Sequence, residues 1–431
     1  MQAPVSKASV NAIQERLNVL KKAYAAYQAE GLSLDMSRGK PCAEQLDLSL
    51  EMLRCVSPEE MYLSMGGTDA RNYGVLDGIP EAKQLFADIF AIDPAQVIVC
   101  GNSSLNIMFD YIATAYAKGV CGNVPWSQQG AVKFLCPVPG YDRHFAITGF
   151  FGIEMLPIPM TAEGPDMDAV EEAVKDPLVK GIWCVPMYSN PEGITYSDTT
   201  VRRFAKLRPA AADFRIMWDN AYCLHHLYEE EQDALLNLYA EAEKEGTENH
   251  VIQFTSTSKI SFPGAGVAAV AASPDNVADI KRRMTVQTIG HDKLNMIRHI
   301  RYFKDLEGIK AHMKRHAAIM RPKFDVVLRA LQNAFGNTDM VTWNTPKGGY
   351  FVSANLLPGC AKKTVQLLKE AGVVLTGAGA TYPHGNDPQD SNLRIAPTYP
   401  SEQELAKAME LFCVCAEIAC LEKLLSETSA K

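Results

Sequence analysis

The chain opens with apolar residues at helical spacing. Ile13, Leu17 and Leu20 recur every three or four positions, which places them on one face of a helix. Gly31 follows this pattern, and residues 32–41 are rich in turn-forming residues. We therefore predict an N-terminal helix that ends near Gly31, followed by an extended segment.

Short apolar runs alternate with helix-like segments through the middle of the chain. The predicted strands are 96–100, 131–136, 153–157, 181–185, 215–218, 252–254 and 265–272. Helix-like segments such as 105–118 and 200–206 separate several of these strands. This alternation of strand and helix predicts an α/β fold with a mostly parallel sheet covered by helices.

The C-terminal third has a different pattern. Residues 275–335 are helical and charged, and a final helix is predicted from about 401 to 426. Ser401 precedes Glu404 by three positions, which is the signature of a capped helix start. Short strands are predicted between the two helical regions at 339–342, 349–353, 373–375 and 392–396.

The length and the two patterns predict two domains. A chain of 431 residues is long enough for roughly two or three. We predict a large α/β domain over 49–305 and a smaller α+β domain built from 1–48 and 306–431.

Composition narrows the class of protein. A net charge of −8 argues against a nucleic-acid partner, which would require a basic face. We find neither an N-terminal signal nor an apolar run of about 18 residues that could span a membrane. The eleven cysteines are scattered and odd in number, which predicts reduced core residues rather than disulfides or a metal site. We therefore expect a cytoplasmic protein without membrane association.

Lys259 is the first candidate for chemistry. It follows the apolar run 251–254 and four small hydroxyl residues, Thr255-Ser256-Thr257-Ser258. A lysine in this position suits an amine held still for a reaction. Taken alone, the pentapeptide fits a solvated loop lysine equally well.

Four further motifs lie at predicted strand ends, where α/β sheets bind ligands. Residues 101–104, Gly-Asn-Ser-Ser, could receive an anion at a helix start, and the tyrosine of 139–142, Pro-Gly-Tyr-Asp, could stack on an aromatic ring. Residues 189–193, Ser-Asn-Pro-Glu-Gly, restrict the asparagine before the proline. In 219–222, Asp-Asn-Ala-Tyr, the aspartate ends an apolar strand and needs a cation if buried. By itself, each of the first three also fits an ordinary turn, and for the first two the turn is the better interpretation.

Together the five ordered motifs resemble the fold-type I pyridoxal-phosphate enzymes, specifically the class I/II aminotransferases. The resemblance runs from about Arg38 to Pro397. The segments SRGKP, NPEG, DNAY and QTIGHDKLN are similar to an aspartate aminotransferase subgroup related to MocR-type domains. The resemblance implies pyridoxal 5'-phosphate as cofactor, a mostly parallel sheet of about seven strands, and a homodimer with active sites shared between subunits.

The resemblance also implies roles around the cofactor ring. Lys259 would bind the cofactor covalently and move the proton at the substrate α-carbon, as a desolvated lysine can. Asp219 would pair with the pyridine nitrogen. Asn190 and Tyr222 would bind the ring's phenolic oxygen, with Asn190 also at the substrate, and Tyr141 would stack on the ring.

Small polar residues would hold the cofactor phosphate. The implied set is Asn102, Ser103 and Ser256, with Ser104 or Ser258 as further members and Tyr73 reaching the phosphate of the neighbouring subunit. Many relatives also carry an arginine seven or eight positions after the lysine. Gly266 and Val267 stand at those positions, so the phosphate charge must be balanced differently here.

The resemblance implies residues that bind the substrate α-carboxylate, but it does not identify the residue that binds a second carboxylate. Arg394 would grip the α-carboxylate through its forked guanidinium, and the Gly39 backbone would lie over the substrate. A dicarboxylic substrate needs a second cation. Arg38 is the first candidate, followed by Lys293 and Arg298, although each fits a surface salt bridge equally well.

We therefore expect an enzyme that moves the amino group of an acidic amino acid, aspartate first, to 2-oxoglutarate by a ping-pong mechanism. Its partners would be a small amino acid and a 2-oxo acid. The alternatives are an aminotransferase for aromatic amino acids or 2-aminoadipate, or a C–S lyase. A cofactor-sensing transcription regulator would need a DNA-binding module ahead of Gly39, where we predict a single helix.

Overall fold

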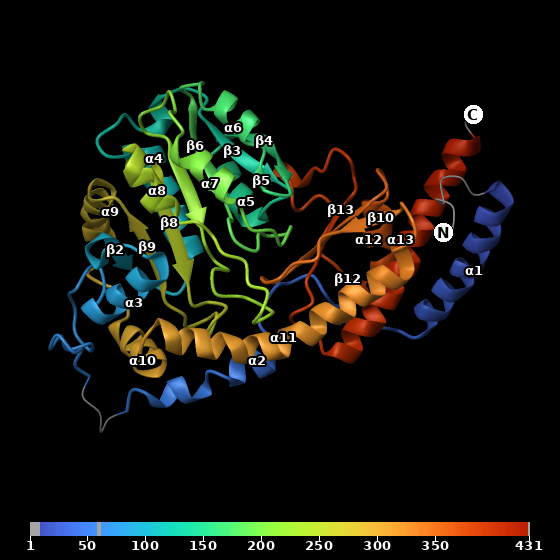
Figure 1. The fold of residues 1–431 in the computed structure, drawn as a ribbon, viewed down its shortest axis with the longest axis horizontal. Coiled ribbons are helices and arrows are strands. Elements are labelled where there is room, and N and C mark those ends of the chain that lie inside the picture. The colour runs from blue at the N-terminus through green and yellow to red at the C-terminus, as the bar shows by residue number, and fades with distance from the viewer. Residues whose placement is uncertain (1–8, 58–61, 430–431) are drawn as a thin grey trace.

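The computed structural model describes residues 9–57 and 62–429. The first eight residues, which belong to the predicted opening segment and small domain, lie outside this range, as do 58–61 and the last two residues. A helix-covered sheet forms one part of the molecule and a smaller group of strands and helices forms the other (Figure 1). Helix α11 (Leu306–Phe335) runs along both parts.

The large sheet has eight strands in the order β2-β9-β8-β7-β6-β3-β4-β5. Strands β4, β3, β6, β7 and β8 are neighbours and parallel, which confirms the mostly parallel sheet. The strands are β2 (Val97–Val99), β3 (Lys133–Val138), β4 (Glu154–Thr161), β5 (Gly164–Pro165), β6 (Val179–Cys184), β7 (Arg215–Asp219), β8 (Val251–Ser256) and β9 (Ala268–Ala272). Strand β5, the last in this order, has only two residues and lies at the edge of the sheet.

Strand β9 runs antiparallel to β8 and to β2. The connection from β8 to β9 is short and contains no crossover helix, and a parallel return would require one. The loop that carries Lys259, residues 257–267, therefore joins two antiparallel strands rather than a strand and a helix.

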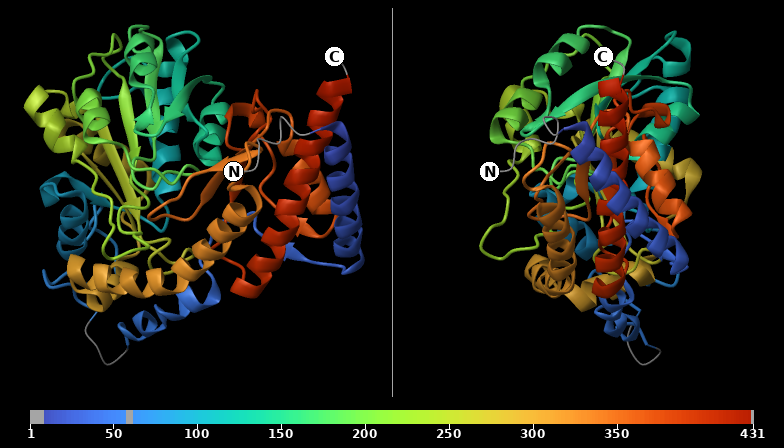
Figure 2. Two further views of the ribbon diagram at one scale, coloured as in Figure 1. Left: turned by 45° about the vertical axis from the view of Figure 1, so that its right-hand side comes forward. Right: turned by 90° about the vertical axis from the view of Figure 1, so that its right-hand side faces the viewer.

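Helices cover both faces of this sheet (Figure 2). They are α3 (Pro80–Phe90), α4 (Ser104–Lys118), α5 (Asp142–Phe150), α6 (Met167–Ala173), α7 (Asp198–Ala205), α8 (Leu238–Glu245), α9 (Pro274–Gln287) and α10 (Lys293–Phe303). Alternate residues of one strand enter different cores: Met217 packs on one side, and Ile216 and Trp218 pack on the other. Burial on both faces explains why the strands read as continuous apolar runs.

The smaller part combines both ends of the chain. Strands β10 (Val341–Trp343), β11 (Val352–Leu356) and β13 (Asn392–Ile395) form an antiparallel sheet, and β1 (Leu34–Asp35) pairs with β12 (Val373–Val374). Around them lie α1 (Val10–Ala29), α2 (Ala43–Asp47), α12 (Ala361–Glu370) and α13 (Glu402–Ser429). Helix α1 lies beside α13, as both views of Figure 2 show, and Arg16 pairs with Glu417 across them. The division at 49–305 stays a prediction.

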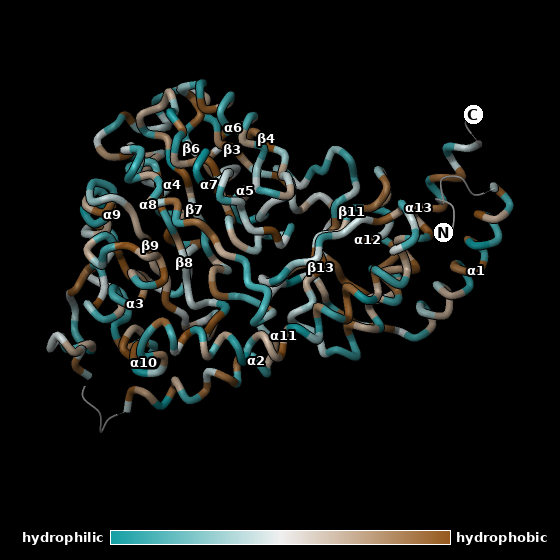
Figure 3. The backbone as a smooth tube through the Cα atoms, viewed as in Figure 1, coloured by the Kyte–Doolittle hydropathy of each residue, from teal (hydrophilic) through white to brown (hydrophobic). Residues whose placement is uncertain are grey.

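Hydropathy changes along the helices, and several predicted strands begin two or three residues later than expected, at Lys133, Ala268, Val341 and Val352. In Figure 3, α1 and α11 alternate between hydrophilic and hydrophobic colours along their length. The strand predicted at 349–353 begins instead at Val352, because Gly349 has a φ of 83° and packs on Tyr188 in a turn. At the last helix, the Ser401–Glu404 capping box is confirmed by reciprocal hydrogen bonds.

The cysteines lie largely where the sequence predicted them. Seven of the eleven cysteines are buried, as predicted. The prediction of a core position is wrong for Cys121, which lies exposed in a turn after α4.

No helix in residues 9–57 and 62–429 combines the length and apolarity that a membrane span requires.

Candidate active site

The predicted motifs meet at one edge of the large sheet. Asp219 ends β7 and pairs in register with Phe254 of β8, so the loops after both strands leave the sheet at the same edge. A cavity of about 140 Å³ opens there. It is lined by Ser103, Ser104, Leu105, Met108, Tyr141, Val185, Asn190, Asp219, Ala221, Tyr222, Ser256, Ser258 and Lys259.

The Lys259 amine lies inside this cavity. Its Nζ donates a hydrogen bond to the Tyr222 hydroxyl at 3.1 Å. Desolvation lowers the pKa of the Lys259 amine, and the Arg394 charge acts in the same direction, while Tyr141 and Asp219 oppose it. A lowered pKa leaves more neutral amine at neutral pH, which is the form that attacks a carbonyl carbon.

Asp219 has one satisfied oxygen and one free oxygen. Its Oδ2 accepts a hydrogen bond from Nε2 of His144 at 3.1 Å. Its Oδ1 is buried and, among the described residues, has no partner. An unpaired buried carboxylate oxygen is unfavourable, so this atom calls for a donor from a ligand. The N–H of a protonated pyridine ring is such a donor, and the site therefore fits pyridoxal phosphate.

His144 is a functional residue that we did not predict. It lies in the first turn of α5, three positions after Tyr141, and its ring stacks on Trp183 with centroids 4.4 Å apart. The stack fixes the imidazole so that Nε2 faces Asp219. Its only signal in the sequence is a histidine near the start of a helix that follows the tyrosine motif.

The predicted phosphate ligands divide into two groups. Ser103, Ser104, Ser256 and Ser258 all line the cavity, and Ser104 begins α4, where unpaired backbone N–H groups attract anions. Asn102 is not among the lining residues, because its Nδ2 donates to the Pro263 carbonyl at 3.3 Å.

Tyr73, Gly266 and Val267 contribute nothing to the cavity within one subunit. Tyr73 is 81% exposed and lies outside it. Val267 is buried in apolar surroundings, so the position where relatives carry a phosphate-binding arginine presents no cation here. A Cβ on Gly266 would already lie 3.1 Å from the backbone nitrogen of Ser258.

Arg394 lies beside the cavity on β13. Its Nη1 donates to Asn190 Oδ1 at 3.1 Å and to Asp142 Oδ1 at 2.9 Å. The guanidinium lies 4.8 Å from the Phe351 ring centroid. Gly39 is another neighbour of that ring, since an added Cβ there would lie 2.3 Å from Phe351 Cζ. The structure thus brings Gly39 and Arg394 to the same ring, as expected for two parts of one substrate site.

Three residues are candidates to bind the second carboxylate of a dicarboxylic substrate, and their surroundings differ. Arg38 is exposed, and the described residues offer it no ion pair. Lys293 is buried and donates from Nζ to the Gly74 carbonyl at 3.0 Å, while Arg298 donates to Asn295. None of the three forms an ion pair among the described residues. Arg298 also keeps a buried Nε that has no acceptor there, and Arg38 is the exposed one of the three.

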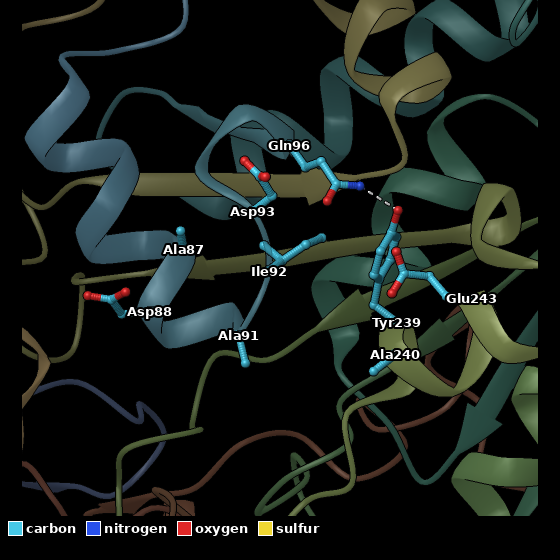
Figure 4. Close-up of a pocket in the computed structure, with 9 residues that line it drawn as sticks. All are labelled: Ala87, Asp88, Ala91, Ile92, Asp93, Gln96, Tyr239, Ala240 and Glu243. Carbon is cyan, nitrogen blue, oxygen red and sulfur yellow. Dashed lines mark hydrogen bonds between the residues drawn. The ribbon is translucent and has the colours of Figure 1, made fainter.

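A larger hollow elsewhere carries no comparable chemistry. It has a volume of about 700 Å³ between α3, the short helix Pro94–Gln96 and α8 (Figure 4). Gln96 bonds Tyr239 across it, and its charged lining residues are the carboxylates Asp88, Asp93 and Glu243. None of the predicted motif residues lines it.

Comparisons with known proteins agree with this geometry. The family model described as "Aspartate amino-transferase" matches residues 8–428. An aspartate aminotransferase of Corynebacterium glutamicum is 44% identical over 94% of this chain and 93% of its own, and a putative aminotransferase of Mycolicibacterium smegmatis is 46% identical over 94% and 95%.

A solved structure supports the same assignment. The crystal structure of an aspartate transaminase from Corynebacterium glutamicum has a TM-score of 0.96 at 42% identity and covers 98% of this chain and 100% of its own. With a full-length family model and relatives well above 30% identity, the chain belongs to the aspartate aminotransferase family, a family of fold-type I pyridoxal-phosphate enzymes.

Proposed function

We propose that this enzyme transfers the amino group of an acidic amino acid, aspartate first, to 2-oxoglutarate, with pyridoxal 5'-phosphate as cofactor. One observation carries the proposal: the enclosed Lys259 amine shares a cavity with the unpaired Oδ1 of Asp219, beside an arginine that can receive a carboxylate. The name of the relative from Corynebacterium glutamicum supports the choice of aspartate.

Each residue has a distinct task in this proposal. When bound, the cofactor supplies the electron sink that makes the substrate α-carbon acidic. Asp219 keeps a proton on the pyridine nitrogen, Lys259 takes the proton from the α-carbon and returns it, and Arg394 holds the α-carboxylate. Burial raises the pKa of Tyr222, so its hydroxyl stays protonated beside the amine.

Substrate choice gives the direct test of the proposal. Single amino acids are added to the purified holoenzyme, and amino transfer is measured for aspartate, alanine, a tyrosine-like substrate and 2-aminoadipate. Aspartate should have the highest kcat/KM. Preference for an aromatic amino acid or 2-aminoadipate would refute the aspartate assignment, and elimination of sulfur from a thioether substrate would favour a C–S lyase.

We expect Arg38 to bind the side-chain carboxylate of aspartate, which is the distal carboxylate of the substrate. We expect Arg38→Ala to lower kcat/KM for aspartate about 100-fold, because a charge-assisted hydrogen bond is lost. Alanine, which has no distal carboxylate, should lose less than about threefold. Arg298→Ala is the comparison, since Arg298 is another candidate and its buried Nε has no acceptor among the described residues; a larger selective loss there would assign the role to Arg298. Equal losses for aspartate and alanine in Arg38→Ala would contradict this role.

We also propose a cytoplasmic homodimer in which Tyr73 serves the neighbouring subunit. Tyr73 is 81% exposed, so its side chain is accessible to a neighbouring subunit. Tyr73→Ala should lower activity about tenfold as a phosphate hydrogen bond is lost.

Subunit mixing tests whether this site is shared. A Lys259→Ala subunit combined with a Tyr73→Ala subunit should form hybrids in which one site has both side chains intact. An equal mixture should recover about a quarter of wild-type activity, since about half of the dimers are hybrids. Tyr73→Ala mixed with itself is the control, and no recovery in the hybrid would show that Tyr73 acts within its own subunit.

A further inference from the structure

The ion pair between Asp142 and Arg394 has no place in the function proposed so far. Asp142 is the first residue of α5, and Arg394 lies in β13, 252 positions later. The carboxylate oxygen and Nη1 are 2.9 Å apart, and the Arg394 side chain is 8% exposed. A short ion pair on a nearly buried guanidinium restricts how that group can be presented.

The hydrogen-bond donors of Arg394 are divided between the protein and the cavity side. A guanidinium has five N–H donors in a planar fork. Nη1 carries two of them, and it donates to Asp142 Oδ1 and to Asn190 Oδ1. Nε is buried and, in the described part of the chain, has no acceptor. The edge that contains Nε is therefore the edge left for a ligand carboxylate.

Two acceptors fix the guanidinium better than one. The Asn190 oxygen alone would leave the group free to turn about a single hydrogen bond. Asp142 adds a second acceptor from another element, and Phe351 supports the group at 4.8 Å. A group that is already oriented loses less rotational freedom when its ligand binds.

The position of Asp142 in the helix suits this task. As the first residue of α5, Asp142 stands at the positive end of the helix dipole, a favourable position for an acidic side chain. The same turn places Tyr141 against the cavity and His144 against Asp219. The start of α5 thus contacts both the cofactor aspartate and the substrate arginine.

We propose that Asp142 is a positioning residue that accepts the Nη1 hydrogen bond of Arg394 and so turns the Nε edge of the guanidinium toward the substrate α-carboxylate. This inference rests on the proposed function only in taking Arg394 as the carboxylate site. It predicts that the loss of the acceptor weakens carboxylate binding and leaves the chemical step nearly unchanged.

Two substitutions separate hydrogen-bond acceptance from simple structural support. Asp142→Ala removes the acceptor, and Asp142→Asn keeps an Oδ1 oxygen in the same place. Succinate, which has carboxylates but no amino group, is titrated into the holoenzyme by calorimetry, and KM and kcat are measured with aspartate. Arg143→Ala, an exposed neighbour in the same turn, is the matched control.

We expect Asp142→Ala to raise the succinate Kd and the aspartate KM about tenfold, with kcat within about threefold of wild type. Asp142→Asn and Arg143→Ala should stay within about threefold in all three quantities. Melting temperature and cofactor absorbance should match the wild type in every variant, which separates the effect from misfolding.

The proposal would be overturned by an unchanged succinate Kd in Asp142→Ala, by an Asp142→Asn variant as weak as Asp142→Ala, or by a fall in kcat at constant KM. Succinate that does not bind the wild-type protein would overturn it too, because Arg394 would then not receive carboxylates. If the wild type binds succinate but transfers no amino group, the proposed function fails while the comparison of Kd values still tests Asp142.

Discussion

Replacement of Lys259 by alanine is expected to lower amino transfer by at least about 10⁴-fold, the largest effect of any single substitution in this chain. The amine is enclosed, bonded to Tyr222 and shifted toward its neutral form. It would supply both the nucleophile and the proton carrier, so its loss removes two functions together. Lys259→Arg should fail as well, because a guanidinium keeps the charge but gives up no proton at neutral pH.

Turnover with aspartate and the visible absorbance of the purified protein provide the measurement. Lys323→Ala is a matched control, since Lys323 is also buried but donates to the Thr398 carbonyl instead. That variant should unfold more easily yet still transfer amino groups. Activity within tenfold of wild type in Lys259→Ala would contradict the assignment of this lysine.

The principal site residues could be predicted because they lie next to strands in the sequence. Lys259 and Asp219 follow apolar runs that are strands β8 and β7, and parallel strands deliver their carboxyl ends to one edge. Arg394 has no such local signal, and only the resemblance to a family identified it.

The partners of these residues could not be predicted, because the contacts join distant parts of the chain. His144 is 75 positions from Asp219, and Asp142 is 252 positions from Arg394. A histidine or an aspartate near a helix start is equally compatible with solvent exposure or helix capping. Which of them meets a functional side chain depends on how α5 packs between the two parts of the molecule.

The strands, too, could be predicted only in part from the sequence. Apolar runs predicted the strands of the large sheet apart from the two-residue β5, since both faces of the central strands are buried. The direction of β9 and the late start of β11 depend on backbone geometry instead. The first follows from a connection without a helix, and the second from the positive φ of Gly349.

Substitution of Asp219 by asparagine is expected to reduce kcat/KM for aspartate about 10³-fold, the second largest effect. The amide keeps an oxygen for the Nε2–H of His144 but loses the negative charge that holds a proton on the pyridine nitrogen. His144→Phe is the matched comparison. It keeps an aromatic ring against Trp183 while removing the hydrogen bond, and should reduce kcat/KM only about tenfold. A loss in Asp219→Asn no greater than in His144→Phe would contradict the role of the charge.

Stability should change in the opposite direction to activity. In the protein without cofactor, Oδ1 of Asp219 is a buried carboxyl oxygen with no donor among the described residues, which is unfavourable for folding. The cofactor-free Asp219→Asn variant should therefore unfold at a higher temperature than the cofactor-free wild type, by an amount equivalent to about 1–3 kcal/mol. Cofactor binding should remove or reverse this difference, because the carboxylate then has its donor. A cofactor-free variant less stable than the wild type would show that Oδ1 is satisfied without the cofactor. Cofactor binding would then not supply a missing hydrogen bond to Asp219.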